Sequence, residues 1–108
     1  MKGLQAVGRR NRISGFFCTN YFLKKVWDRK IEVEHLGPIL NELPKNRPER
    51  FCLVAGLLEI QKTRENALML KIHDHLFITV FFAHLENYQR KNKKDKFIIS
   101  DIKYRGKP

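Results

Sequence analysis

Between Arg50 and Tyr104, apolar stretches recur at the spacing of short strands, and this pattern constrains the fold more than any other feature. Three apolar stretches come first. A segment from Ala83 to Lys91 without Gly or Pro follows, and then a last apolar stretch from Phe97 to Ile102. This order predicts three strands, a helix and a final strand, which is the order of a small Greek-key barrel. We therefore expect an α+β fold that is mainly β with short helices.

Alternation within the expected strands predicts which side chains share a face. Because successive strand residues point to opposite faces, Phe77 and Phe81 are expected together on one face of the third strand. Met69 and Lys71 are expected on the half-solvated face of the second strand. Gly56, inside the first strand, predicts a bulge or a sharp bend of the kind that a small barrel needs to turn a corner.

Changes in composition divide the chain into three segments. Residues 1–14 are basic with little periodicity, and we expect them to be flexible. Residues 15–47 form an amino-terminal segment that ends in a linker at 44–48, where two prolines flank polar residues. Residues 48–108 are expected to form the barrel domain.

The segment before the linker is expected to be helical or irregular. Aromatic and apolar residues from Phe16 to Trp27 recur near helical spacing, which predicts a helix near residues 17–28. The tripeptide Leu-Gly-Pro at 36–38 is expected to break the chain, and residues 39–43 to form one or two helical turns.

The charge of the chain points to an anionic partner. Its 108 residues include 22 Lys and Arg against 11 Asp and Glu, a net charge of +11. Such an excess attracts polyanions, with nucleic acid as the first expectation and an anionic membrane surface as the second. A solvated basic surface without a dedicated partner is the alternative. No stretch approaches the roughly 20 apolar residues of a membrane-spanning helix.

No recognisable set of catalytic residues or metal ligands is visible. Cys18 and Cys52 form no Cys-x-x-Cys pair, which indicates neither a zinc site nor a redox site and fits a reducing cytoplasm. The tripeptide His-Asp-His at 73–75 offers zinc ligands but lacks a third well-spaced partner. Ser100 lies in no nucleophile motif, and no Gly-rich phosphate loop is present. We therefore expect no catalytic site, no metal and no cofactor.

A binder of single-stranded nucleic acid combines a cationic groove with aromatic rings on which bases stack. The hairpin after the first strand, the two following strands and the basic loop before the last strand supply residues of both kinds. For the two phenylalanines, packing in the core remains the alternative, because Phe is usually buried. The predicted contact residues are Lys62, Arg64, Met69, Lys71, Phe77, Phe81, Lys93, Lys94 and Lys96.

Residues 50–105 resemble an oligonucleotide-binding (OB) barrel, specifically the one near the carboxyl end of the alpha subunit of bacterial DNA polymerase III. The likeness is carried by short apolar and basic motifs in the order in which that barrel has them. Upstream, the Gly-aromatic-aromatic segment at 15–23 is similar to the one that precedes the barrel in that family. The motifs are Val54-Ala55-Gly56, Lys62-Thr63-Arg64, the stretch 68–74, the stretch 78–82, Tyr88 and the stretch 94–99.

The resemblance implies a non-catalytic module that binds single-stranded DNA or RNA in DNA replication, with other replication proteins as further partners. A five-stranded barrel needs another strand after Tyr104, so we expect an incomplete barrel, or one that an upstream segment completes. This fits a fragment or remnant of the polymerase subunit.

Two alternatives stay open. One is an RNA-binding or ribosome-associated protein with the same barrel. The other is a peripheral membrane or protein-interaction module that uses residues 13–30, where Trp27 accompanies Lys24, Lys25 and Arg29. Of the partners considered, a membrane is the least expected.

Overall fold

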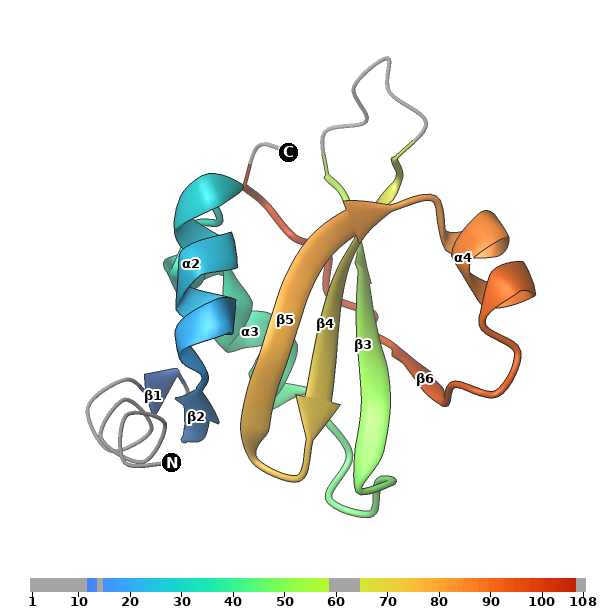
Figure 1. Cartoon of the computed structure of the whole chain (residues 1–108), viewed down its shortest axis with the longest axis horizontal. Helices are drawn as coiled ribbons and strands as arrows, with labels where there is room; N and C mark the ends of the chain where they lie inside the picture. Colours follow the sequence, from blue (N-terminus) through green and yellow to red (C-terminus); the bar gives the residue numbers. More distant parts are fainter. Residues whose placement is uncertain (1–11, 14, 59–64, 107–108) are drawn as a thin grey trace.

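A meander of three long antiparallel strands forms the centre of the molecule (Figure 1). The computed structural model describes residues 12–13, 15–58 and 65–106. In the meander, β3 (Arg50–Gly56) pairs with β4 (Ala67–His73), and β4 pairs with β5 (Leu76–Ala83). The helix α4 (Leu85–Lys91) follows directly. The predicted order of three strands, a helix and a strand is confirmed.

Three shorter strands extend the meander into a six-stranded mixed sheet. Its order is β1-β2-β5-β4-β3-β6, with β2 parallel to β5 and β6 parallel to β3. Within the described residues, β1 and β6 are the two edges and do not pair with each other. A closed barrel requires its outer strands to pair, so the described sheet is open and does not form a closed barrel. The shorter strands are β1 (Arg12–Ile13), β2 (Phe16–Cys18) and β6 (Phe97–Ile99).

The sheet stays open because of what lies on either side of the meander. On one side, β2 joins β5 where Phe17 faces Leu76, although the sequence predicted helical or irregular structure there. On the other side, β6 pairs with β3 over only three residues. The strand then ends in a local turn, in which the Ser100 hydroxyl accepts a hydrogen bond from the backbone N–H of Ile102 at 3.0 Å. The predicted strand from Phe97 to Ile102 is therefore shorter than expected.

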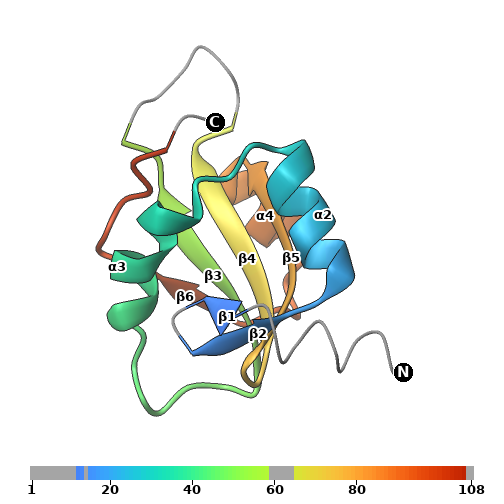
Figure 2. The ribbon, with the colours of Figure 1, turned by 90° about the vertical axis from the view of Figure 1, so that its left-hand side faces the viewer.

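Two helices cover one face of the sheet (Figure 2). The helix α2 (Asn20–Asp28) begins where the Thr19 hydroxyl accepts a hydrogen bond from the N–H of Phe22 at 2.9 Å. Such a cap satisfies a donor that has no partner within the helix. Lys30, with φ of 53°, follows the end of α2. The predicted helix near 17–28 is present but starts later, because its first residues belong to β2.

The second covering helix, α3 (Leu36–Asn41), follows a short 3-10 turn, η1 (Val33–His35). The tripeptide at 36–38 was expected to break the chain, yet it forms the first turn of α3. Pro38 is tolerated there because backbone N–H groups in the first turn have no acceptor within the helix.

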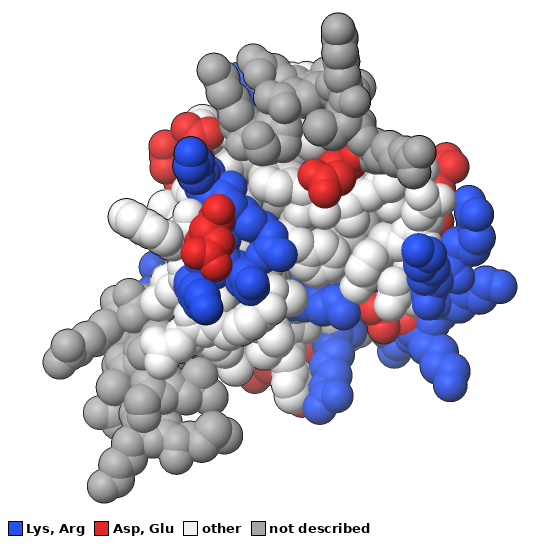
Figure 3. Space-filling view, turned by 45° about the horizontal axis from the view of Figure 1, so that its top comes forward, with Lys and Arg blue, Asp and Glu red and all other residues white. Residues whose placement is uncertain are grey.

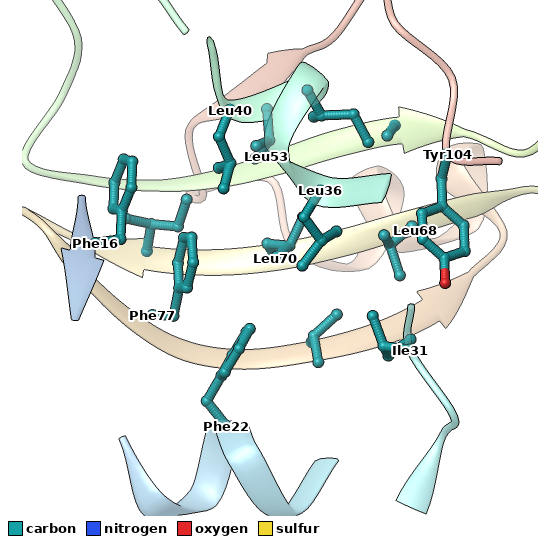
Figure 4. Packing of buried hydrophobic residues seen from close by; sticks show 14 of the residues in the cluster. Phe16, Phe22, Ile31, Leu36, Leu40, Leu53, Leu68, Leu70, Phe77 and Tyr104 are labelled. Atoms are coloured by element: carbon teal, nitrogen blue, oxygen red, sulfur yellow. The ribbon is translucent and has the colours of Figure 1, made fainter. Parts of the chain in front are cut away.

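The main core lies between α2, α3 and the sheet (Figure 4). The Phe77 ring stacks between Phe16 and Phe22, with centroids 4.8 Å and 4.9 Å away, and has no exposed surface. Tyr104 closes the other end of the core, where its hydroxyl accepts a hydrogen bond from the N–H of Glu32 at 2.9 Å. Residues before and after the proposed boundary at 47/48 thus share one sheet and one core.

An extra residue in β5 sets the face on which each of its side chains lies. Phe77 pairs with Ile72, but Thr79 pairs with Lys71, so Ile78 is the unpaired residue of a bulge. As a result, Phe77 and Val80 enter the main core while Phe81 lies on the opposite face. The prediction that Phe77 and Phe81 share a face is wrong. The predicted bulge at Gly56 is also absent, since β3 pairs with β4 without interruption.

Candidate nucleic-acid interface

A groove lies on the sheet face opposite α2 and α3. It has a volume of about 740 Å³ and is bounded by β3, β4, the bulge of β5 and the segment after α4. The charged and apolar side chains that line it include Glu49, Arg50, Lys71, His73, Ile78, Lys94, Asp95 and Lys96.

The groove exists because α4 is too short to cover this face. A helix of seven residues is about 10 Å long, whereas the seven residues of β4 extend about 23 Å. At its own end of the face, α4 packs Leu85 and Tyr88 over Val54 and Met69. No described helix covers the rest of the face, toward Arg50 and His73.

The segment after α4 brings its lysines to the rim of the groove. The side-chain amide of Asn92 donates to the carbonyl of Tyr88 at 2.8 Å, which closes the end of α4. The N–H of Asp95 then donates to the carbonyl of Asn92 at 3.0 Å, and the N–H of Cys52 donates to the carbonyl of Lys96 at 2.8 Å. These bonds fix residues 92–96 against β3.

Among the Lys and Arg side chains that line the groove, Lys71 has the most contacts. Its Nζ lies 3.9 Å from Oδ2 of Asp95 and 5.6 Å from the centroid of the Tyr88 ring. A hydrogen bond with Tyr88 raises the pKa of Lys71, and Asp95 adds to the rise while partial burial opposes it. The amine is therefore fully charged at neutral pH.

The two acidic side chains of the groove each have a partner. Besides the contact of Asp95 with Lys71, Oε1 of Glu49 lies 3.3 Å from Nε2 of His73. By contrast, Arg50, Lys94 and Lys96 have no ion-pair partner within the described part of the chain. We call Arg50, Lys71, Lys94 and Lys96 the groove cations. Three of the four are thus free to pair with an anion.

Positive charge continues outside the groove. Figure 3 shows Lys and Arg gathered at α4 and the segment after it, and a second cluster over α2. Residues 90–96 contain five Lys or Arg and one Asp. Lys93, a predicted contact residue, is exposed in this segment but does not line the groove.

Of the nine predicted contact residues, the structure brings three together in the groove: Lys71, Lys94 and Lys96. Phe81 lies half-buried beside α4, its ring centroid 5.3 Å from that of Tyr88. Phe77 and Met69 have no exposed surface, so neither can contact a nucleotide in this fold, and both are corrected to core residues. Lys62 and Arg64 lie outside the described residues.

Arg50 and His73 were not predicted as contact residues, although the alternation of β3 contains the signal for Arg50 and that of β4 the signal for His73. Phe51 points into the main core, so Arg50 and Cys52 must point to the other face. Arg50 pairs with His73 across the ladder and Cys52 pairs with Lys71, so all four side chains belong to one face.

Neither thiol has the properties of a nucleophile at neutral pH. Burial raises the pKa of Cys18 to about 11 and that of Cys52 to about 12, from an ordinary 9.0. Both cysteines are buried and unbridged. A thiol must be deprotonated to attack or to bind a metal.

The tripeptide at 73–75 does not form a metal-ligand cluster. His73 faces Glu49, whereas Nε2 of His75 lies 3.8 Å from Oδ1 of Asp74. In the described residues, the potential metal ligands that cluster within 4.8 Å are instead Glu32, Glu34 and His35, a largely exposed group that the sequence pattern did not indicate.

No described helix is long and apolar enough to cross a bilayer. Comparisons with protein-family models, with curated proteins and with solved structures gave no match to this chain.

Proposed function

We propose that this chain binds single-stranded nucleic acid without catalysing a reaction, and that the groove cations hold the phosphates. The observation that carries the proposal is the convergence of four cations on one groove, three of them without an ion-pair partner among the described residues. When a nucleic acid strand binds to such a cluster, counterions leave its phosphates, and their release favours binding.

Aromatic stacking contributes little in the groove itself. Phe77 is in the core. Phe81 packs against the ring of Tyr88, and the Lys71 ammonium group lies over that same ring. Recognition in the groove therefore depends on charge and shape. We expect weak sequence preference and strong dependence on salt.

The biological context remains a proposal from the resemblance to the polymerase barrel. It comprises a role in DNA replication beside other replication proteins, in a chain that is a fragment or remnant of a polymerase alpha subunit. The OB-like topology belongs to the same proposal. The alternative is a ribosome-associated protein that binds RNA in the same groove. Two unbridged thiols are compatible with the cytoplasm.

The membrane alternative is weaker, because the apolar side of α2 is already packed against the sheet. Phe22 has no exposed surface and packs on Phe77. An interfacial helix needs that side free to enter the lipid.

The test is the anisotropy of a labelled oligothymidylate, titrated with protein at several salt concentrations. If each groove cation neutralises one phosphate, affinity falls roughly 50-fold between about 50 and 200 mM salt. Removing one contact with Lys94→Ala or Lys96→Ala reduces the slope of log K against log salt by about 0.7. The matched control is Lys103→Ala, because Lys103 is exposed near Gly56, at the far end of β3 from Arg50.

Two results contradict the proposal. One is an equal slope for the wild type, Lys94→Ala, Lys96→Ala and Lys103→Ala, which places the phosphates elsewhere. The other is tighter binding to anionic vesicles than to single strands at low salt, which makes the charge a membrane determinant. RNA and DNA strands of the same sequence, compared in the same assay, distinguish the two biological contexts.

A further inference from the structure

The most exposed aromatic side chain of the described residues lies far from the groove, on α2. Trp27 is 84% exposed and Tyr21 is 56% exposed. Large aromatic rings are normally buried for most of their surface. The exposed indole ring of Trp27 is therefore a candidate contact for a partner.

The surroundings of Trp27 are cationic. Between residues 20 and 31 the chain has Lys24, Lys25, Arg29 and Lys30 against the single acid Asp28. On a helix, residues three positions apart are neighbours, so Lys24 lies beside Trp27 on the outer surface. Figure 3 shows this cluster over α2, separated from the cluster at α4 by a largely uncharged surface.

Of the two exposed rings, Trp27 is the one with both faces free. The Nζ of Lys25 lies 5.1 Å from the centroid of Tyr21 and so occupies one face of that ring. No ring and no cation within the described residues contacts Trp27. A flat ring that is free on both faces and flanked by lysines is the arrangement on which an unpaired base stacks, while the lysines contact its phosphates.

We propose that the outer surface of α2 is a second contact for the nucleic acid, in which Trp27 stacks on an unpaired base and Lys24 pairs with an adjacent phosphate. The inference rests on the function proposed for the groove. It assigns different tasks to opposite sides of the sheet, phosphate binding in the groove and base stacking on α2. A strand that contacts both surfaces passes around the β5 side of the sheet, where α2 lies (Figure 1).

Nucleic acid fits this surface better than a lipid bilayer does. Binding in a bilayer scales with the apolar area that enters it. Here the apolar side of α2 packs on β5, and the outer side offers only two rings among charged groups. Stacking requires a single ring, which Trp27 provides.

The experiment uses the intrinsic fluorescence of Trp27, which is the sole tryptophan of the chain. An oligothymidylate of about 16 nucleotides, the upper end of the site size of one small barrel domain, is titrated into the full chain. Anisotropy of a labelled copy reports binding independently of Trp27. An abasic strand of equal length keeps the phosphates and removes the bases.

We expect the oligothymidylate to quench Trp27 strongly and the abasic strand to leave its emission nearly unchanged while still binding. Trp27→Ala should weaken binding of the oligothymidylate about fivefold or more, and Trp27→Phe should weaken it less because a ring remains. Ile99→Ala, which shortens another exposed apolar side chain, should bind as the wild type does.

Binding by anisotropy with unchanged Trp27 emission, and with equal affinity of Trp27→Ala and the wild type, overturns the second contact and leaves the groove intact. A blue shift of Trp27 with anionic vesicles but no quenching by strands also overturns it and assigns α2 to a membrane. Absence of any anisotropy change at low salt overturns both proposals.

Discussion

The two faces of one sheet differ in how far helices cover them. On the core face, α2, α3 and Tyr104 leave no described side chain of the cluster with more than 6% of its surface exposed. On the other face, α4 covers one end only, and the remainder is a groove lined by cations. The candidate site therefore lies where helical cover stops, because charged side chains occupy the uncovered end.

The faces also use their aromatic rings differently. On the core face, Phe16, Phe22 and Phe77 form a continuous stack without solvent contact. On the groove face, the Tyr88 ring contacts those of Phe81 and Phe97, and all three residues keep part of their surface exposed. The first group is expected to carry stability, and the second to shape the end of the groove.

The largest expected effect comes from truncating one ring on each face. Phe77→Ala removes a fully buried ring and is expected to lower the free energy of unfolding by about 3–5 kcal/mol. Phe81→Ala should cost clearly less, because part of that ring is already in contact with water. Urea denaturation followed by circular dichroism measures both values. Equal losses for the two variants would show that the groove face is packed as tightly as the core face.

An intermediate effect is expected from the two thiols, since Cys18 belongs to the core face and Cys52 to the groove face. Burial raises the pKa of Cys18 to about 11 and that of Cys52 to about 12. A pKa that is raised in the folded state means that the protonated thiol stabilises the fold. This contribution is complete below the ordinary pKa of 9.0 and is lost as the pH rises through the pKa of the folded state.

The free energy of unfolding should therefore fall between pH 9 and about 12. Cys18→Ala should make this fall shallower between pH 9 and about 11, and Cys52→Ala should make it shallower over the whole range. Denaturation midpoints at a series of alkaline pH values measure the effect. A profile that neither substitution changes would show that both thiols are accessible to water.

The smallest effect concerns the contact between Asp95 and Lys71. Both side chains are 40% exposed and their charged atoms are 3.9 Å apart, so solvent screens the pair. Asp95→Asn releases the Lys71 ammonium group for a phosphate and is expected to tighten strand binding by about two- to fivefold at low salt. Weaker binding by Asp95→Asn would mean that Asp95 positions the loop rather than competing for Lys71. Glu86→Gln, in the first turn of α4, serves as a control for the loss of a nearby negative charge.

The strands of the meander could be predicted from the sequence because apolar residues occupy most of their seven or eight positions. The sheet edges could not be predicted. β2 has only three residues, too few for a pattern, and it is held by pairing with β5 from a distant part of the chain. Closure depends on which strands meet at the edges, and alternation within a strand carries no information about that.

The groove was partly predictable for the same reason. Lys71, Lys94 and Lys96 stand out as cations within or beside apolar strands, and the structure places all three in the groove. The error at Phe77 arises from the bulge at Ile78, which changes the side of the sheet to which later residues point. Met69 was misassigned because α4 covers its end of the face.

The bulge at Ile78 has a consequence for how this protein can change in evolution. Because the extra residue reverses the phase of β5, substitutions at 79, 81 and 83 alter the sheet face on the side of α4, whereas those at 77, 80 and 82 alter the main core. A one-residue deletion there would move Val80 and Phe82 out of the main core and turn residues 79, 81 and 83 toward it. Tolerance to insertions and deletions should therefore be lowest at Ile78, although 36% of the surface of this residue is exposed.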